Sequence, residues 1–369
     1  MAADSRVSQA GGLLAGMRVL DASPYRPMPH ATQVLADLGA EVLKLEPPGG
    51  DPMRVYPELF AAIARGKRSI VLDLRTDDGR RRALELAAQA DVVCEAWRPD
   101  VASRLGLGYD AVAAVNPSVI YCSLTGYGQT GPWRDVPGHD VNYQALAGAL
   151  APPRPPQREP SVPRLPAADL EGGTMCALLV CAAWARRLVT GEGERIDVAM
   201  TDVVSWWVGA HSGTAHVDSA EATRGSPGYG VFATRDGRWV AIGVLGEERL
   251  WRSICAALEL DDLAAADFAT RLAMVDVVNA RVAAAIAARD ADDVTERLLA
   301  HGAPVSPVLT PEEATRHEQL VARGLFLETT RGLVPDLPAL LSRNPRRSAT
   351  AIPDVNQHPE GFTPPVTHG

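Results

Sequence analysis

The segments M-R-V-L-D-A at residues 17–22, H-A-T-Q-V-L-A-D-L-G at 30–39 and E-V-L-K-L-E at 41–46 decide the fold of this chain. The first and third are short apolar runs typical of buried strands, and the second repeats its apolar residues with the period of a helix. A strand, a helix and a second strand joined by short loops form a βαβ unit, in which the strands are parallel. The sequence therefore predicts a parallel sheet in this part of the chain.

The same alternation continues beyond residue 46. Further apolar runs predict strands at 67–74, 91–96, 118–124 and 195–200, and helical periodicity predicts helices at 79–90, near 110–115, at 175–188 and around 203–208. Strands that alternate with helices over so many segments indicate a doubly wound, mostly parallel, Rossmann-like α/β sheet.

A smaller α+β domain is expected after this sheet. Short strand segments surround Asp236-Gly237, a dipeptide that favours a hairpin turn, and amphipathic helices follow from residue 247 onward. We expect a large domain at residues 1–224, completed by 321–369, and a small domain at 225–320. The segment after residue 342, rich in Arg, Pro and Thr, is expected to lie along the surface or to be partly mobile.

Composition excludes several classes of function. The 369 residues are 46% hydrophobic and 22% charged, which is typical of a globular chain, and the net charge of −9 makes nucleic acid and anionic membranes poor partners. The five cysteines are odd in number and show no metal-binding spacing, which fits a reducing cytoplasm. The first residues show no signal peptide, and the apolar run at 175–185 is shorter than the roughly 20 residues of a membrane span.

The stretch from residue 137 to residue 173 carries the strongest candidates for chemistry, His139 and Asp169. An imidazole and a carboxylate in one pocket can hold different protonation states near neutral pH, as a reaction requires when it removes a proton from one face of a carbon and returns it to the other. The proline-rich segment 151–166 between them is expected to be a loop across the mouth of the site. Asp169 can alternatively serve only as the N-cap of the following helix.

A formal dinucleotide-binding motif, G-Y-G-Q-T-G at residues 126–131, follows a predicted strand. The motif works by placing a pyrophosphate at the N-terminus of a helix, and Pro132 with its neighbours predicts more loop in place of a helix. We therefore expect no nicotinamide cofactor there, and no metal or other resident cofactor elsewhere.

Taken together, the chain resembles the family III CoA-transferase and α-methylacyl-CoA racemase superfamily, also called CaiB/BaiF, over roughly residues 16–345. The motifs that carry the resemblance are G-M-R-V-L-D, D-L-G-A-E-V-L-K-L-E-P-P-G-G-D-P, A-R-G-K-R-S-I-V-L-D-L, E-A-W-R-P-D-V, L-G-L-G-Y, L-T-G-Y-G-Q-T-G-P, G-H-D-V-N-Y, the D-x-x-G-G at Asp169, and D-G-R-W-V-A-I-G. The resemblance implies an interlocked homodimer and an acyl-CoA thioester as the substrate, with coenzyme A entering as part of it.

Two branches of the superfamily differ in their catalytic groups. Racemases carry G-H-D-x-N-Y, whose histidine is one base, and a later aspartate as the other, which map to His139 and Asp169. Transferases keep the aspartate as a nucleophile and usually lack the histidine. The chain therefore resembles the racemase branch, in which a glutamate supports the histidine, and Glu247 is the nearest match, with Glu248 as the alternative. The transferase is the second interpretation, and a non-catalytic acyl-CoA-binding relative is the third.

Residues expected to bind the CoA part of the substrate come from several loops. The basic candidates are Arg98, Lys67 and Arg68, for which ordinary surface charge is the competing interpretation. The other expected contacts are Tyr25, Gly138 and Tyr143. The segment from Tyr25 to Met28 is bulkier than the glycine-rich turn of racemases, which predicts an unusual environment for the ligand.

Overall fold

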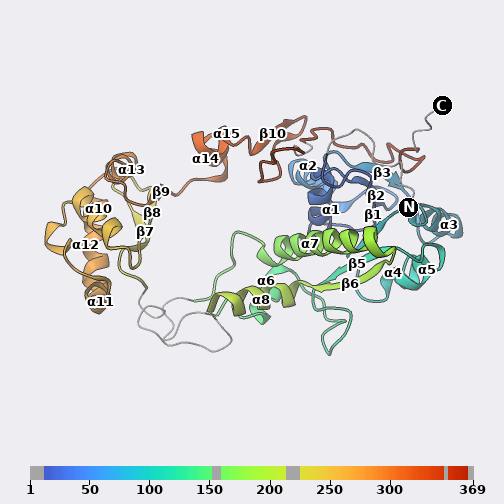
Figure 1. Cartoon of the computed structure of the whole chain (residues 1–369), viewed down its shortest axis with the longest axis horizontal. Coiled ribbons are helices and arrows are strands. Elements are labelled where there is room, and N and C mark those ends of the chain that lie inside the picture. The colour runs from blue at the N-terminus through green and yellow to red at the C-terminus, as the bar shows by residue number, and fades with distance from the viewer. Residues whose placement is uncertain (1–11, 152–158, 213–224, 345–347, 365–369) are drawn as a thin grey trace. The chain divides into compact units, whose positions relative to one another are not determined.

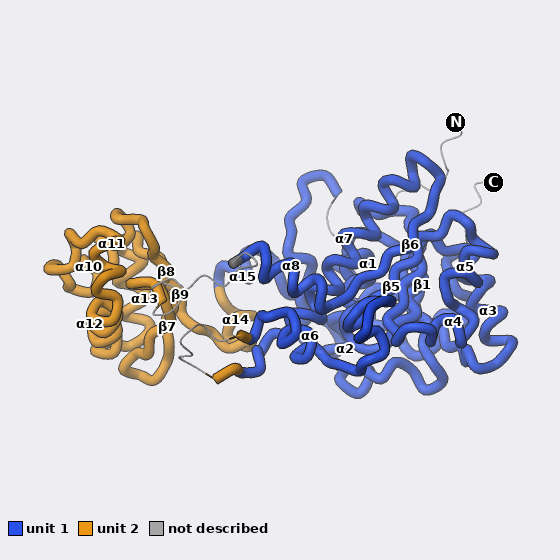
Figure 2. The backbone as a smooth tube through the Cα atoms, turned by 90° about the horizontal axis from the view of Figure 1, so that it is seen from below, with its two compact units in different colours: residues 1–150, 161–211, 318–369 blue, residues 151–160, 212–317 orange. Residues whose placement is uncertain are grey.

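The computed structural model describes residues 12–151, 159–212, 225–344 and 348–364 (Figure 1). The chain divides into two compact units (Figure 2). Unit 1 comprises residues 1–150, 161–211 and 318–369, and unit 2 comprises residues 151–160 and 212–317. The expectation from the sequence placed the smaller domain at residues 225–320.

Unit 1 is built on a six-stranded parallel sheet with the order β3-β2-β1-β4-β5-β6. Its strands are β1 Arg18–Asp21, β2 Glu41–Glu46, β3 Arg68–Val71, β4 Val92–Glu95, β5 Ile120–Thr125 and β6 Glu194–Ala199. The order runs outward in both directions from the pair β1 and β4, so the predicted doubly wound parallel sheet is confirmed. In such sheets, ligands bind at the carboxyl ends of the strands near this reversal.

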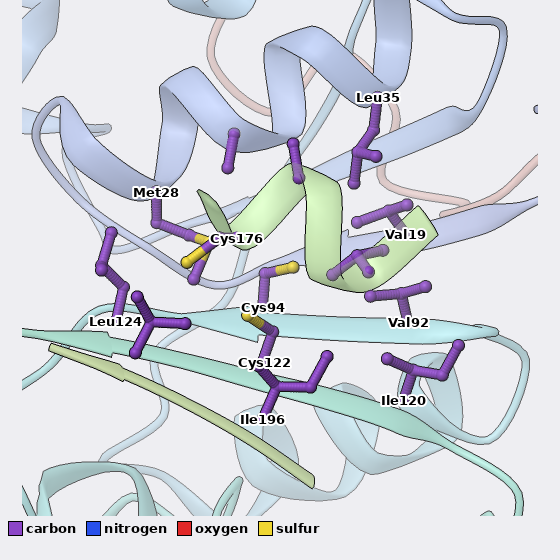
Figure 3. Close-up of a cluster of buried hydrophobic side chains, with 14 of the residues drawn as sticks. Val19, Met28, Leu35, Val92, Cys94, Ile120, Cys122, Leu124, Cys176 and Ile196 are labelled. Atoms are coloured by element: carbon purple, nitrogen blue, oxygen red, sulfur yellow. The ribbon is translucent and has the colours of Figure 1, made fainter. Parts of the chain in front are cut away.

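The helices cover both faces of the sheet. Helices α1 (Pro27–Asp37) and α7 (Ala167–Thr190) pack on one face, over side chains that include Val19, Val92 and Cys122 (Figure 3). Alternate strand residues point to the other face, where they meet α3 (Asp77–Ala87) and α5 (Tyr109–Val115). Side chains of successive strand residues point in opposite directions, and this gives the sheet two apolar faces. The remaining helices of unit 1 are α2 (Pro57–Ala64), α4 (Val101–Arg104), α6 (Asp140–Leu146), α8 (Met200–Ser212) and α15 (Glu318–Ala322), with the short helix η1 (Pro52–Val55).

Helix α7 begins earlier than the sequence predicts. The apolar periodicity starts at Met175, but the helix starts at Ala167, so Asp169 lies in its first turn rather than before it. Its N-cap residue is Pro166, and the interpretation of Asp169 as the N-cap is wrong. Within the described part of the chain, α7 is also the one helix long and apolar enough for a membrane span, although one of its faces is packed against α1 and the sheet.

Unit 2 contains a three-stranded antiparallel sheet and a layer of helices. The hairpin of β7 (Tyr229–Ala233) and β8 (Trp239–Gly243) turns at Gly237, whose φ of +76° suits glycine, so the predicted hairpin is confirmed. Strand β9 (Val305–Pro307) pairs with β8. The helices in the described residues of this unit are α10 (Glu248–Leu258), η2 (Asp261–Leu263), α11 (Phe268–Ala273), α12 (Val275–Ala287), α13 (Ala291–Ala300) and α14 (Pro311–Arg316). The buried Trp251 at the centre of this core donates its ring N–H to Leu263 O at 2.8 Å.

The C-terminal segment returns to unit 1. Strands β10 (Phe326–Thr329) and β11 (Gly332–Pro335) form a hairpin. The chain then runs beside the edge strand β3, where His358 N donates to Ser69 O at 2.8 Å and Val71 N donates to Asn356 Oδ1 at 2.9 Å. These bonds cover backbone groups that an edge strand would otherwise expose.

Helices α1 and α7 come very close at Gly173. A Cβ atom on Gly173 would lie 2.4 Å from Pro27 O, whereas a Cβ atom on Gly209 in α8 would meet no atom within 4 Å. We expect Gly173→Ala to lower the free energy of unfolding of unit 1 by about 1–3 kcal/mol, because the helices have to separate. The matched variant Gly209→Ala should be neutral or stabilising by up to about 1 kcal/mol, since alanine favours a helix. Thermal unfolding measures both, and equal midpoints would show that the close approach at Gly173 is not a constraint.

Candidate active site

One cavity of about 720 Å³ lies at the carboxyl ends of β1, β4 and β5, within unit 1. Its walls come from the loops that follow these three strands, from the start of α6 and from the first turn of α7. Six residues singled out by the sequence line it: Tyr25, Arg98, Gly138, His139, Tyr143 and Asp169. The structure therefore brings His139 and Asp169 into one cavity. The two residues are far apart in the sequence, since Asp140, which follows His139, lies 29 positions before Asp169.

An aromatic side chain fixes the loop that carries His139. Tyr143 is buried, and a Cβ atom on Gly126 or Gly138 would lie 2.4 or 2.6 Å from its ring, so neither position accepts a larger residue. The Tyr143 hydroxyl donates to Gly138 O at 2.5 Å, and burial raises the pKa of this hydroxyl to about 12. Tyr127 packs edge-to-face on the Tyr143 ring at 5.2 Å between centroids. Tyr143 thus shapes the cavity wall as a neutral phenol.

His139 is the residue from which α6 starts. Its backbone N–H donates to Asn142 Oδ1 at 3.0 Å, and Asn142 N donates to His139 O at 2.8 Å. These two bonds close the first turn and hold the backbone of His139. The imidazole itself is exposed at the cavity, so a ligand can reach it.

Asp169 carries a carboxyl group whose pKa is raised from 3.8 to about 6. Burial is the main cause, and the negative charge of Asp140 adds to it, while the positive charges of Arg26 and His139 act in the opposite direction. Among the residues that the structure describes, none donates a hydrogen bond to the Asp169 carboxylate. The group is therefore a half-buried carboxyl that can exist in both protonation states near neutral pH.

Asp140 connects the two helices that carry the candidate acid/bases. One carboxylate oxygen accepts from Asp169 N at 3.1 Å, and the other accepts from Gln144 Nε2 at 2.5 Å. Its hydrogen bond fixes the first turn of α7 against α6, and its charge raises the pKa of Asp169. The structure gives Asp140 a positioning role.

Arginine side chains line the cavity at three places. Arg98 is exposed on the loop after β4, and Arg134 is paired with Asp100 at 2.8 Å. Arg26, on the loop after β1, was not singled out as a site residue by the sequence. The signal for it was weak, because an arginine before a helical proline is also an ordinary surface residue.

The two other expected CoA contacts, Lys67 and Arg68, are engaged within the fold. The Lys67 ammonium is buried, with Asp21 at 3.1 Å, Pro29 O at 2.9 Å and Thr32 Oγ1 at 2.6 Å, and burial lowers its pKa to about 8. Arg68 donates to Gly361 O at 2.8 Å and pairs with Glu360. Neither residue lines the cavity. These two cations connect β3 with α1 and with the C-terminal segment. Their positions in the sequence alone do not reveal this structural role.

Only part of the Tyr25–Met28 segment, which was expected to add bulky side chains near the CoA site, lines the cavity. Met28 is fully buried in the core between α1 and the sheet, whereas Tyr25 is 58% exposed. Tyr25 has a φ of +65°, which is uncommon for a residue with a side chain, and it lines a second cavity as well.

This second cavity, of about 460 Å³, lies at the ends of β1, β2 and β3 and was not predicted. It shares three residues with the first, Pro24, Tyr25 and Trp97. Its wall is largely apolar, and the exposed side chain of Arg75 is among the lining residues. The two cavities therefore adjoin each other at Pro24, Tyr25 and Trp97.

Unit 2 carries the glutamates offered as partners of His139. Glu248 accepts from Phe268 N at 2.9 Å and lies 3.4 Å from the Arg271 guanidinium, so it is engaged within its own unit. Glu247 is exposed and accepts from Leu245 N at 2.9 Å. Of the two, Glu247 is the one whose side chain is available to a group outside unit 2.

Two loop predictions have different outcomes. Residues 126–131 form a loop, and the next helix starts only at Asp140, so the prediction of more loop in place of a helix is confirmed. The proline-rich segment 151–166 lies for the most part, at 152–158, outside the described residues. Within the described ranges, no three His, Cys, Asp or Glu side chains gather as metal ligands.

The raised pKa of Asp169 has a consequence for stability. The carboxyl group binds its proton more tightly in the folded chain than in the unfolded chain, so its contribution to stability is present below pH 4 and is lost as the pH rises to about 6. We expect Asp169→Asn to be more stable than the parent by about 1–2 kcal/mol at pH 8, after allowance for solvent screening. The gain should disappear below about pH 4. Chemical unfolding at both pH values measures it, and a gain that does not change with pH would contradict the raised pKa.

Comparison with known proteins gives a consistent pattern. The sequence matches CoA-transferase family III over residues 14–359. It is 31% identical to an acetyl-CoA:oxalate CoA-transferase of Acetobacter aceti, over 89% of this chain and 88% of that protein. It is also 31% identical to an alpha-methylacyl-CoA racemase of Homo sapiens, over 94% of this chain and 90% of that protein. Among solved structures, a CAIB/BAIF family protein from Brucella suis superposes with a TM-score of 0.84 at 29% identity, covering 95% of this chain and 98% of that one.

Proposed function

Because the chain belongs to CoA-transferase family III, the CaiB/BaiF superfamily, we propose that it is an acyl-CoA α-epimerase of the α-methylacyl-CoA racemase type. The observation that carries this proposal is the presence of His139 and Asp169 in one cavity, supplied by two different helix starts. A transfer of CoA needs only a carboxylate nucleophile, whereas inversion at a carbon needs two acid/base groups.

The reaction moves one proton at the α-carbon of the thioester. One group takes the α-proton while the C–H electron pair moves into the thioester carbonyl, which gives an enolate. The other group then donates a proton to the opposite face of the carbon and restores the carbonyl. A pKa of about 6 lets Asp169 act as the base in one direction and as the acid in the other.

The start of α7 supports the charge that develops on the enolate. The N-terminus of a helix carries free N–H groups and a partial positive charge. Asp169 lies in this first turn, so the reacting carbon would sit beside it. Stabilisation of a developing oxyanion by fixed dipoles is a large term in enzyme catalysis.

The two cavities suit the two ends of an acyl-CoA. The first holds the acid/base pair, and the second, at about 460 Å³, is apolar with aromatic residues at its junction with the first. We assign the thioester to the first cavity and the nucleotide end to the second. Arg98 is the cation that we assign to the CoA phosphates, because it is exposed at the first cavity next to the shared residue Trp97.

The remaining expectations belong to the same proposal. Glu247 is assigned to support His139 in the assembled enzyme, and the enzyme is assigned the interlocked homodimer that the resemblance implies. No cofactor is required besides the coenzyme A of the substrate.

A CoA-transferase is the second candidate. In that reaction the Asp169 carboxylate attacks the thioester carbonyl and expels CoA thiolate, which leaves a mixed anhydride of Asp169 and the acyl group. The thiolate then attacks the aspartyl carbonyl, releases the first carboxylic acid and forms an aspartyl-CoA thioester. An incoming carboxylate attacks this thioester, and the same two steps in reverse give the new acyl-CoA and the free Asp169 carboxylate. The carboxylate lines the cavity without a hydrogen-bond donor among the described residues, and the relative named as a CoA-transferase is as similar as the racemase. His139 would then be dispensable.

Proton NMR of a 2-methylacyl-CoA in D2O, without an added acid, tests the proposal. We expect deuterium to enter at the α-carbon and the rate to rise as the pH passes through about 6, where Asp169 ionises. His139→Ala and Asp169→Asn should each lower the rate by roughly 100-fold or more. The controls His301→Ala and Asp262→Asn change exposed residues of unit 2 and should leave the rate unchanged.

Other outcomes decide against the epimerase. Transfer of CoA to an added carboxylic acid, without α-proton exchange, would assign the transferase reaction. Retention of transfer in His139→Ala would add to that assignment, because the nucleophile alone is needed. An absence of both reactions would favour a protein that only binds acyl-CoA.

A further inference from the structure

Arg26 is a cation that the proposed reaction does not use. It lies between β1 and α1, lines the first cavity and is half-buried. Among the residues that the structure describes, none accepts a hydrogen bond from its guanidinium and none forms an ion pair with it within 4 Å. Arg134, in the same cavity, is by contrast paired with Asp100.

The packing of α1 on α7 places Arg26 beside Asp169. Pro27 O, in the residue after Arg26, lies where a side chain of Gly173 would be, and Gly173 is one turn along α7 from Asp169. One turn further along α1, His30 Nε2 lies 3.3 Å from Thr174 Oγ1. The positive charge of Arg26 accordingly acts on Asp169, whose pKa it lowers. The contact of Pro27 O with Gly173 and that of His30 with Thr174 together hold the start of α1 in a fixed position on α7.

A half-buried guanidinium loses part of its hydrogen bonding to water, and without a close acceptor in the protein these bonds are not replaced. An acceptor group of a ligand can replace them. Arginine matches a carboxylate because its planar N–H groups can donate two parallel hydrogen bonds to it. Asp169 does not provide this pairing in the structure, since the two groups form no ion pair within 4 Å. The cavity thus presents a cation close to the reacting centre but free to bind another anion.

We propose that Arg26 binds a second carboxylate carried by the acyl group, so that the substrate is the CoA thioester of a dicarboxylic acid. This inference rests on the proposed action on acyl-CoA thioesters and adds the substrate class. Arg98 follows Trp97, which lines both cavities, and is assigned to the CoA phosphates. Arg26 lines only the first cavity, and its charge acts on Asp169. Arg26 is therefore a specificity-determining residue.

Glutaryl-CoA and pentanoyl-CoA test this proposal, because their acyl chains have equal length and differ in a terminal carboxylate. Two quantities are measured for each at pH 8, where Asp169 is ionised: the dissociation constant and the rate constant kcat/KM of α-proton exchange in D2O. We expect the parent protein to prefer glutaryl-CoA by about 30-fold, the size of one charge-assisted hydrogen-bonded pair.

The variants separate Arg26 from its neighbours. Arg26→Gln should abolish the preference by weakening only glutaryl-CoA, and Arg26→Lys should keep part of it, because the charge remains without the fork of N–H donors. Arg98→Gln should weaken both thioesters by the same factor and leave their ratio unchanged.

Three results would overturn the assignment of Arg26. They are an equal or better use of pentanoyl-CoA by the parent, an equal effect of Arg26→Gln on both thioesters, and no binding of either. An equal effect would mean that Arg26 acts only on Asp169. A preference in binding without any α-proton exchange would support Arg26 and reject the epimerase, so the two proposals fail separately.

Discussion

Helix α7 meets helix α1 at Gly173, where the absence of a side chain lets Pro27 O lie against the helix. Both helices also cover the same face of the parallel sheet, through a core that includes Met28 and Cys176 (Figure 3). The first turn of α7 carries Asp169, and the residue before α1 carries Arg26. The close contact therefore fixes the start of α1, and with it Arg26, relative to Asp169, the proposed acid/base.

A second constraint comes from α6, whose N-cap residue is His139, the other proposed acid/base. Asp140 accepts a hydrogen bond from the backbone of Asp169, while Tyr143 fixes the loop of His139 through Gly138. The residues G-H-D-V-N-Y thus provide the proposed acid/base, the link to α7 and the aromatic support in six consecutive positions. Burial is the main reason for the raised pKa of Asp169, and the negative charge of Asp140 adds to it, so the same residue affects both the position and the protonation of Asp169.

Sequence patterns were sufficient where local periodicity decides structure. The βαβ unit and the hairpin at Asp236-Gly237 follow from alternating apolar residues and turn chemistry, and the placement of His139 and Asp169 in one cavity agrees with the motif-based expectation. The start of α7 was misplaced because its first two turns are polar and glycine-rich, and tertiary contacts at Gly173 favour the helix there. The burial of Lys67 and the availability of Arg26 depend on contacts between distant segments, which a single sequence does not reveal.

His139 and Asp169 are proposed to act on opposite faces of one carbon. The most direct test follows deuterium exchange separately for the two epimers of a 2-methylacyl-CoA, in His139→Ala and in Asp169→Asn. Each variant keeps one base, so two opposed bases predict residual α-proton exchange of one epimer in one variant and of the other epimer in the other, without inversion in either. Loss of exchange for the same epimer in both variants, or equal exchange of both epimers in either, would contradict a two-base site.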